Sequence, residues 1–151
     1  MELLITIAII AILSAVVFTA IGSQRAKARD ARRISEIKEL ATALSVFDNL
    51  EGYYPESIYP DAASPLVAKG QYTKMPLDPF SDLQYAYIGL GCYMNECSGF
   101  HLGASLETEN VILESDADGN SGSSGFDGGD IGDCSSSKQK KVGWFCYDLW
   151  R

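Results

Sequence analysis

The feature that most constrains this chain is a run of twenty residues, Leu3 to Gly22, without charge or proline. A helix of that length measures about 30 Å, enough to cross the hydrocarbon core of a bilayer. Glu2 stands directly before the run, and a basic cluster follows it, made of Arg25, Lys27, Arg29, Arg32 and Arg33. The sequence therefore predicts a transmembrane helix over residues 1–22.

The helical signal continues past the apolar run. From Ser23 to Leu50 the chain has neither glycine nor proline, and apolar residues recur at three- and four-residue spacing. They are Ile34, Ile37, Leu40, Ala41, Leu44 and Phe47. Gly52 suits a left-handed C-cap, and Pro55 prevents the helix from resuming. We therefore expect one helix of about 70 Å or more, amphipathic over residues 23–52.

The rest of the chain, residues 53–151, is predicted to form a globular head. Ser64 to Gly70 has the N-cap, proline and glycine of a short helical turn. Three aromatic-rich segments are expected to be strands, namely Gln84–Leu90, Gly99–Leu106 and Lys141–Leu149. A small antiparallel sheet packed on the amphipathic half of the helix gives the fold class α+β.

All four cysteines, Cys92, Cys97, Cys134 and Cys146, lie in the head. They could form two disulfides in an oxidising compartment or a metal site. The spacings lack the C-x2-C pairs of a zinc site, which favours disulfides. Pairing of sequence neighbours, Cys92–Cys97 and Cys134–Cys146, is our prediction, although the sequence alone does not separate the three connectivities.

The strongest ligand signal is the Gly-, Ser- and Asp-rich stretch DADGNSGSSGFD. Its acidic and amide residues alternate and then recur at the twelfth position, which matches the first half of a calcium loop. Ser121 stands where such loops carry glycine, and a solvated acidic turn is the alternative. The predicted calcium ligands are Asp116, Asp118, Asn120, Asp127 and Asp130.

Other classes of function find little support. The net charge of −8 argues against nucleic acid as a partner of the head. No G-x-S-x-G motif or nucleotide-binding loop occurs, so we do not expect an enzyme. His101, between Phe100 and Leu102, is expected to be a packed or hydrogen-bonded sheet residue rather than a catalytic one.

The segments ELLITIAIIAIL and ARDARRISEIKELATALSVFDNLEGYYP resemble the N-terminal helix of bacterial type IV pilins and type II secretion pseudopilins. MPLDPF followed by YAYIGL is similar to the pseudopilin region that precedes the sheet. The resemblance is specific over residues 2–55, moderate to residue 107 and weak beyond. Aligned on Glu2, the mature chains of the family would begin three residues before Met1.

The resemblance implies a subunit that sits in the inner membrane and then polymerises into a helical homopolymer at the cell surface. It implies a prepilin peptidase and an assembly platform as partners, and an extracytoplasmic head. Glu2 would then be the assembly residue, paired with the α-amine of a neighbouring subunit. Some pseudopilins bind calcium in a C-terminal loop, which agrees with the ligands predicted above.

The basic cluster conflicts with the cysteines, because Lys and Arg beside a membrane helix normally mark the cytoplasmic side. We expect an extracytoplasmic head and a cluster that is solvated and pairs with acidic heads of neighbouring subunits. Three functions stay open: a major pilin, a pseudopilin of a secretion or DNA-uptake machine, and a monomeric membrane-anchored calcium-binding module. The first is our prediction.

Overall fold

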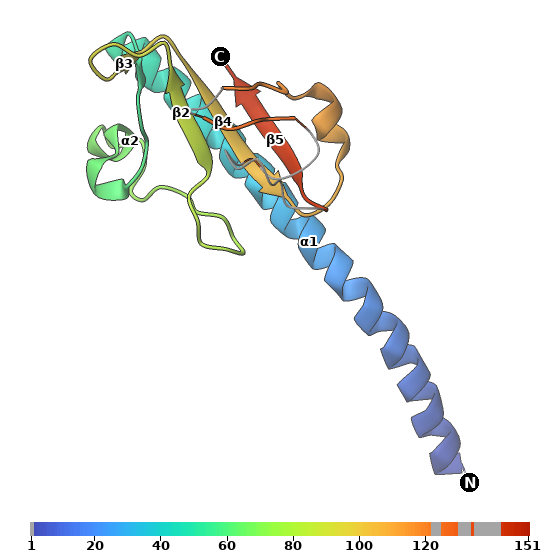
Figure 1. Cartoon of the computed structure of the whole chain (residues 1–151). Coiled ribbons are helices and arrows are strands. Elements are labelled where there is room, and N and C mark those ends of the chain that lie inside the picture. The colour runs from blue at the N-terminus through green and yellow to red at the C-terminus, as the bar shows by residue number, and fades with distance from the viewer. Residues whose placement is uncertain (1, 122–124, 130–133, 135–142) are drawn as a thin grey trace.

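A computed structural model of the chain describes residues 2–121, 125–129, 134 and 143–151, without the side chains of Glu2 and residues 15–20 (Figure 1). Helix α1 (Glu2–Glu51) is 50 residues long, and its N-terminal part projects away from the head. It ends at Gly52, which has a φ of 84° and donates its N–H to the carbonyl of Asp48 at 2.7 Å. The predicted long helix and its glycine cap are confirmed.

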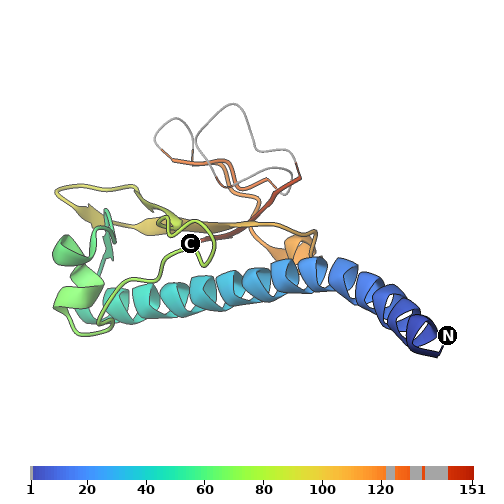
Figure 2. The same cartoon turned by 90° about the horizontal axis from the view of Figure 1, so that it is seen from below.

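The head contains two antiparallel sheets that lie along one side of α1 (Figure 2). The larger one has the order β2–β4–β5, with β2 (Ala86–Leu90), β4 (Gly99–Leu106) and β5 (Phe145–Trp150). The smaller one pairs β1 (Tyr54–Pro55) with β3 (Glu96–Cys97). A long helix packed on small antiparallel sheets confirms the predicted α+β class.

The predicted start of the third strand is wrong. The strand was expected from Lys141, but β5 begins at Phe145, after Gly143 has turned the backbone with a φ of 80°. Lys141 and Val142 lie outside the described residues. At the other edge, Gln84 makes only a single bridge to Leu77, and β2 starts two residues later than predicted.

Short helical segments lie in the connections between the strands. The predicted turn is present as α2 (Pro65–Ala68), and Gly70 follows it with a φ of 73°. Two further single turns are the 3-10 helices η1 (Asp61–Ala63) and η2 (Val111–Ser115).

The apolar stripe of α1 forms one wall of the core. Ile37, Leu40, Leu44 and Phe47 are buried, and Ile34 and Ala41 pack against them in part. Phe100, Leu102 and Leu106 of β4, with Tyr147 of β5, belong to the same cluster. Each such side chain contributes about 1.5–3 kcal/mol on burial, so this wall fixes the helix to the sheet.

Candidate functional site

The N-terminal half of α1 extends beyond the head, and its described side chains at residues 3–13 form an exposed apolar rod. Eight leucine and isoleucine side chains on it are more than half exposed, namely Leu3, Leu4, Ile5, Ile7, Ile9, Ile10, Ile12 and Leu13. Both views show this half extending beyond the sheets (Figures 1 and 2). A contiguous apolar surface of this size marks a site of contact with a membrane or with protein.

The predicted membrane span over residues 1–22 includes side chains that lie outside the described ones, and it stays a prediction. Glu2 begins α1, and its predicted role in assembly is likewise untested. Within the part of the chain that the structure describes, no helix is both long and apolar enough to cross a membrane.

A network of ion pairs connects α1 to the head at the first helical turns that contact the head. The guanidinium of Arg33 is fully buried and pairs with Asp30 at 2.7 Å, Asp78 at 2.5 Å and Glu107 at 2.7 Å. Asp30 in turn accepts hydrogen bonds from the backbone N–H groups of Glu107 and Thr108, both at 2.9 Å. We call Asp30, Arg33, Asp78 and Glu107 the neck network.

The neck network corrects the prediction for the basic cluster. Arg29 and Arg33 do not form a solvated face, because Glu107 and Asp78 of the same chain pair with them. Arg32 pairs with Glu36 one turn along the helix. Arg25 and Lys27, which precede the first head contacts of α1, have exposed side chains as predicted, and the side chain of Arg32 is 62% exposed.

The charges of the network shift the acidity of its members. Burial raises the pKa of Asp78, but the hydrogen bonds from Arg33 and from the backbone of Ser81 and Phe80 outweigh it, bringing the pKa to about 2. The hydrogen bond from Arg29 lowers the pKa of Glu107. Burial lowers the pKa of Arg33, but its three carboxylate partners outweigh that effect and raise the pKa above its ordinary value. The guanidinium therefore stays charged.

These shifts predict acid sensitivity. Because the pKa of Asp78 falls from 3.8 to about 2 on folding, the folded state binds fewer protons between these values. The contribution of Asp78 to the free energy of unfolding should therefore be fully present at neutral pH and decline as the pH falls from about 5 towards 2. Melting temperatures of the full chain in detergent at a series of pH values measure this. Asp78→Asn should flatten the profile, and an unchanged slope in that variant would contradict the assignment.

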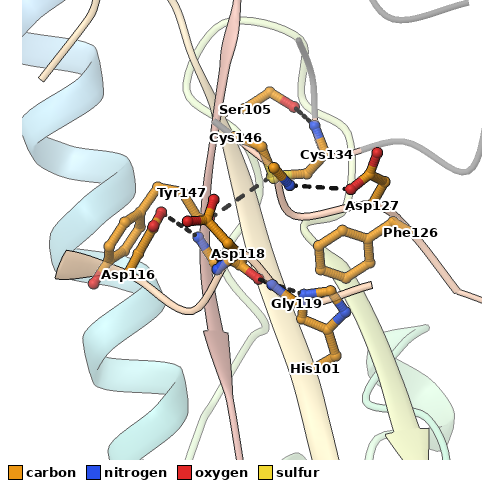
Figure 3. Close-up of a disulfide and its surroundings, with 12 residues drawn as sticks. His101, Ser105, Asp116, Asp118, Gly119, Phe126, Asp127, Cys134, Cys146 and Tyr147 are labelled. Atoms are coloured by element: carbon orange, nitrogen blue, oxygen red, sulfur yellow. Dashed lines mark hydrogen bonds and ion pairs between the residues drawn. A yellow bond between two sulfur atoms is a disulfide. The ribbon is translucent and has the colours of Figure 1, made fainter. Parts of the chain in front are cut away.

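Both predicted disulfides are present. Cys92 is bonded to Cys97, and Cys134 is bonded to Cys146. The first closes the turn between β2 and β4, and the second attaches residue 134 to β5 (Figure 3). Disulfides persist in oxidising compartments, so they indicate an extracytoplasmic head.

The loop that carries the predicted calcium ligands is organised around a carboxylate of the chain itself. Asp148, fully buried on β5, accepts hydrogen bonds from the N–H groups of Asp118 and Gly119, both at 2.9 Å. Asp116 accepts from the N–H of Asp148 at 3.2 Å. The backbone amides of this loop therefore point towards an anion, whereas a calcium loop directs carbonyl oxygens inward.

The other predicted ligands lie on the two limbs of the same loop. Asn120 and Asp127 form an isolated antiparallel bridge, and Asp127 accepts from the N–H of Gly129 at 3.1 Å. Asp130 lies outside the described residues. Among the residues described, no group of three or more His, Cys, Asp or Glu side chains is arranged to hold a metal. Calcium binding stays a prediction.

His101 links the sheet to this loop. Its Nε2 lies 2.7 Å from Asp148, its Nδ1 lies 2.9 Å from the hydroxyl of Ser121, and its ring stacks on Phe126 at 3.8 Å between centroids. The predicted packed, hydrogen-bonded histidine is confirmed, but the sequence reasoning missed Asp148. The available signal was a lone carboxylate inside an aromatic strand, which needs a buried partner.

An aspartate, a histidine and a serine in line are also the parts of a hydrolytic triad. Here the backbone of Phe126 holds the hydroxyl of Ser121, donating its N–H at 2.9 Å and accepting at 3.0 Å. These contacts fix the loop to β4. Gly103 permits the close approach, because a Cβ there would lie 2.7 Å from the ring of Phe126.

The long helix, its exposed apolar part and the small sheets together form an α+β fold that is consistent with the pilin-like class. Comparison of the chain with family models, curated proteins and solved structures gave no match.

Proposed function

We propose that this chain is the structural subunit, or major pilin, of a type IV pilus-like surface filament and polymerises through its N-terminal helix. The observation that carries the proposal is the apolar rod of α1, whose leucine and isoleucine side chains the head does not cover. Burial of eight such side chains would release on the order of 10 kcal/mol. Packing of these rods between copies supplies that burial.

The geometry favours a fibre over a closed ring. The rod lies at one end of the molecule and the head at the other. We expect parallel, staggered rods to make heterologous contacts, which build an open fibre when the rotation between copies does not close. The neck network holds the head in a fixed relation to the helix, which a regular helical lattice requires. The two disulfides agree with assembly outside the cytoplasm.

A pseudopilin is the second candidate. The turn at Leu77–Asp78–Pro79 favours it, because the resemblance to pseudopilins includes this segment and Asp78 contacts the helix directly. Imaging of surface fibres from producing cells, with identification of their main protein, separates the two. Long fibres made of this chain support the pilin. The absence of long fibres, together with a secretion or uptake defect in cells that lack the chain, supports the pseudopilin. A chain that stays monomeric in the membrane would contradict both.

Glu2→Gln tests the proposed assembly mechanism. Loss of one partner from a buried ion pair costs about 3–5 kcal/mol, so fibre yield should fall at least about tenfold. The head should stay folded, and the subunit should stay in the membrane. Glu39→Gln is the matched control, because Glu39 is an exposed carboxylate on the same helix. Normal fibre yield from Glu2→Gln would show that this glutamate takes no part in assembly.

A further inference from the structure

The turn between β2 and β4 is a rigid hairpin that presents apolar side chains to solvent. Tyr93 and Glu96 exchange backbone hydrogen bonds of 2.9 and 3.1 Å, and the Cys92–Cys97 disulfide closes the base. Met94 and Asn95 between them have φ values of 51° and 69°, as in a type I′ turn. We call residues 92–97 the hairpin tip.

Two large side chains of the tip are exposed, although residues of these types are usually at least partly buried. Tyr93 is 74% exposed and Met94 is 78% exposed, although Met94 occupies the left-handed region that favours glycine or asparagine. Strained, exposed positions of this kind gather at sites of contact. Two exposed carboxylates lie beside the tip, Glu96 on β3 and Glu56 directly after β1. The tip therefore presents two exposed large side chains, Tyr93 and Met94, next to negative charge.

The end of the head that α1 enters first has the complementary surface. Ile21 of α1 is 37% exposed, and Arg25 and Lys27 follow it on the helix with exposed side chains. The next arginines along the helix, Arg29 and Arg33, are already paired with Glu107. We call residues 21–27 the basic collar. It combines an apolar surface with positive charge and precedes the first head contacts.

These two surfaces lie at opposite ends of the head, since β3 is beside the C-terminal end of α1 and the collar precedes the first head contacts of the helix (Figure 1). We propose that the hairpin tip of one copy docks on the basic collar of a second copy. Tyr93 and Met94 would meet the end of the apolar rod, and Glu96 and Glu56 would face Arg25 and Lys27. The inference rests on the proposed filament and names the contact between its heads.

A second copy is the occupant that the observations favour. Apolar groups next to acids at one end match apolar groups next to bases at the other, so the chain carries both halves of the contact. The acidic character extends over the head, where Asp and Glu outnumber Lys and Arg by fourteen to six in residues 53–151. Helical residues 25–51 separate the two surfaces, so contacting copies would be offset by about 40 Å along the fibre.

Charge reversal with rescue tests the contact in cells that produce the full chain. Arg25→Glu with Lys27→Glu should reduce fibre yield at least about tenfold, and Glu56→Lys with Glu96→Lys should do the same. A chain that carries all four substitutions should recover most of the fibre yield, because the positive and negative sides of the contact are then exchanged. Lys38→Glu and Glu109→Lys are matched controls, since both residues are exposed and lie outside the tip and the collar.

A photo-crosslinking residue at position 93 gives an independent readout. In wild-type fibres it should link to a peptide that contains residues 21–27 of another copy, whereas the same residue at exposed position 111 should not. Fibres that tolerate both reversals, or crosslinks to another segment or to a different protein, would overturn the docking while leaving the filament proposal intact. Failure of the wild-type chain to form any fibre would overturn both.

Discussion

Arg33→Ala should destabilise the head by about 3–5 kcal/mol, because it leaves three carboxylates around a buried site without their cation. Arg33 is fully buried and contacts Asp30, Asp78 and Glu107, which come from the helix, from the loop before β2 and from the end of β4. Its guanidinium also lies 5.4 Å from the centre of the Trp144 ring. Urea unfolding of the full chain in detergent, followed by tryptophan fluorescence, measures the loss.

Arg32→Ala is the matched control. The substitution is the same and the position is adjacent, but the side chain of Arg32 is 62% exposed and pairs only with Glu36 on its own helix. Exposed pairs of this type contribute about 0.3–0.5 kcal/mol. Equal losses in the two variants would show that the neck network has no special weight and that the helix alone carries the effect.

Asp148→Asn should destabilise the head by about 3 kcal/mol, because an amide cannot accept from all the donors that surround this carboxylate. Two backbone N–H groups and the His101 ring contact its oxygens, and the side chain is fully buried. One oxygen becomes an NH₂ group and then faces a donor. We expect the melting temperature to fall by several degrees and the loop of residues 116–121 to lose protection from proteolysis.

Asp118→Asn provides the comparison for this effect. It removes the same charge from the same loop, but the side chain of Asp118 is exposed and only its backbone N–H contacts Asp148. Asparagine also tolerates the φ of 46° at this position. Stability should therefore change by less than about 0.5 kcal/mol. A loss as large as that of Asp148→Asn would mean that the loop depends on the charge of Asp118 instead.

The sequence predicted best the features that depend on neighbours along the chain. The helical periodicity, the Gly52 cap and the two short-range disulfides each follow from residues close in sequence, and all three are confirmed. The starts of β2 and β5 were misplaced, because strand propensity does not show where the preceding turn ends, at Asp82 before β2 and at Gly143 before β5.

The polar sites were missed because their partners are distant in sequence. Arg33 and Asp78 are 45 residues apart, and His101 and Asp148 are 47 apart. Helical spacing separates the two arginines, because Arg33 stands four and seven residues before the buried Ile37 and Leu40, whereas Arg32 is out of that phase and exposed. Which carboxylates meet the guanidinium of Arg33 depends on which loops the tertiary fold brings to the helix.

The continuity of α1 has a mechanical consequence. Because the same helix forms the exposed rod and one wall of the core, a pull on the rod acts parallel to the surface between helix and sheet. The helix could leave the head only by sliding, so the contacts of Ile37, Leu40, Leu44 and Phe47 would have to break together rather than in turn. The contact between helix and sheet is thus loaded in shear, and the force needed to separate them grows with the number of helical turns that lie on the sheet.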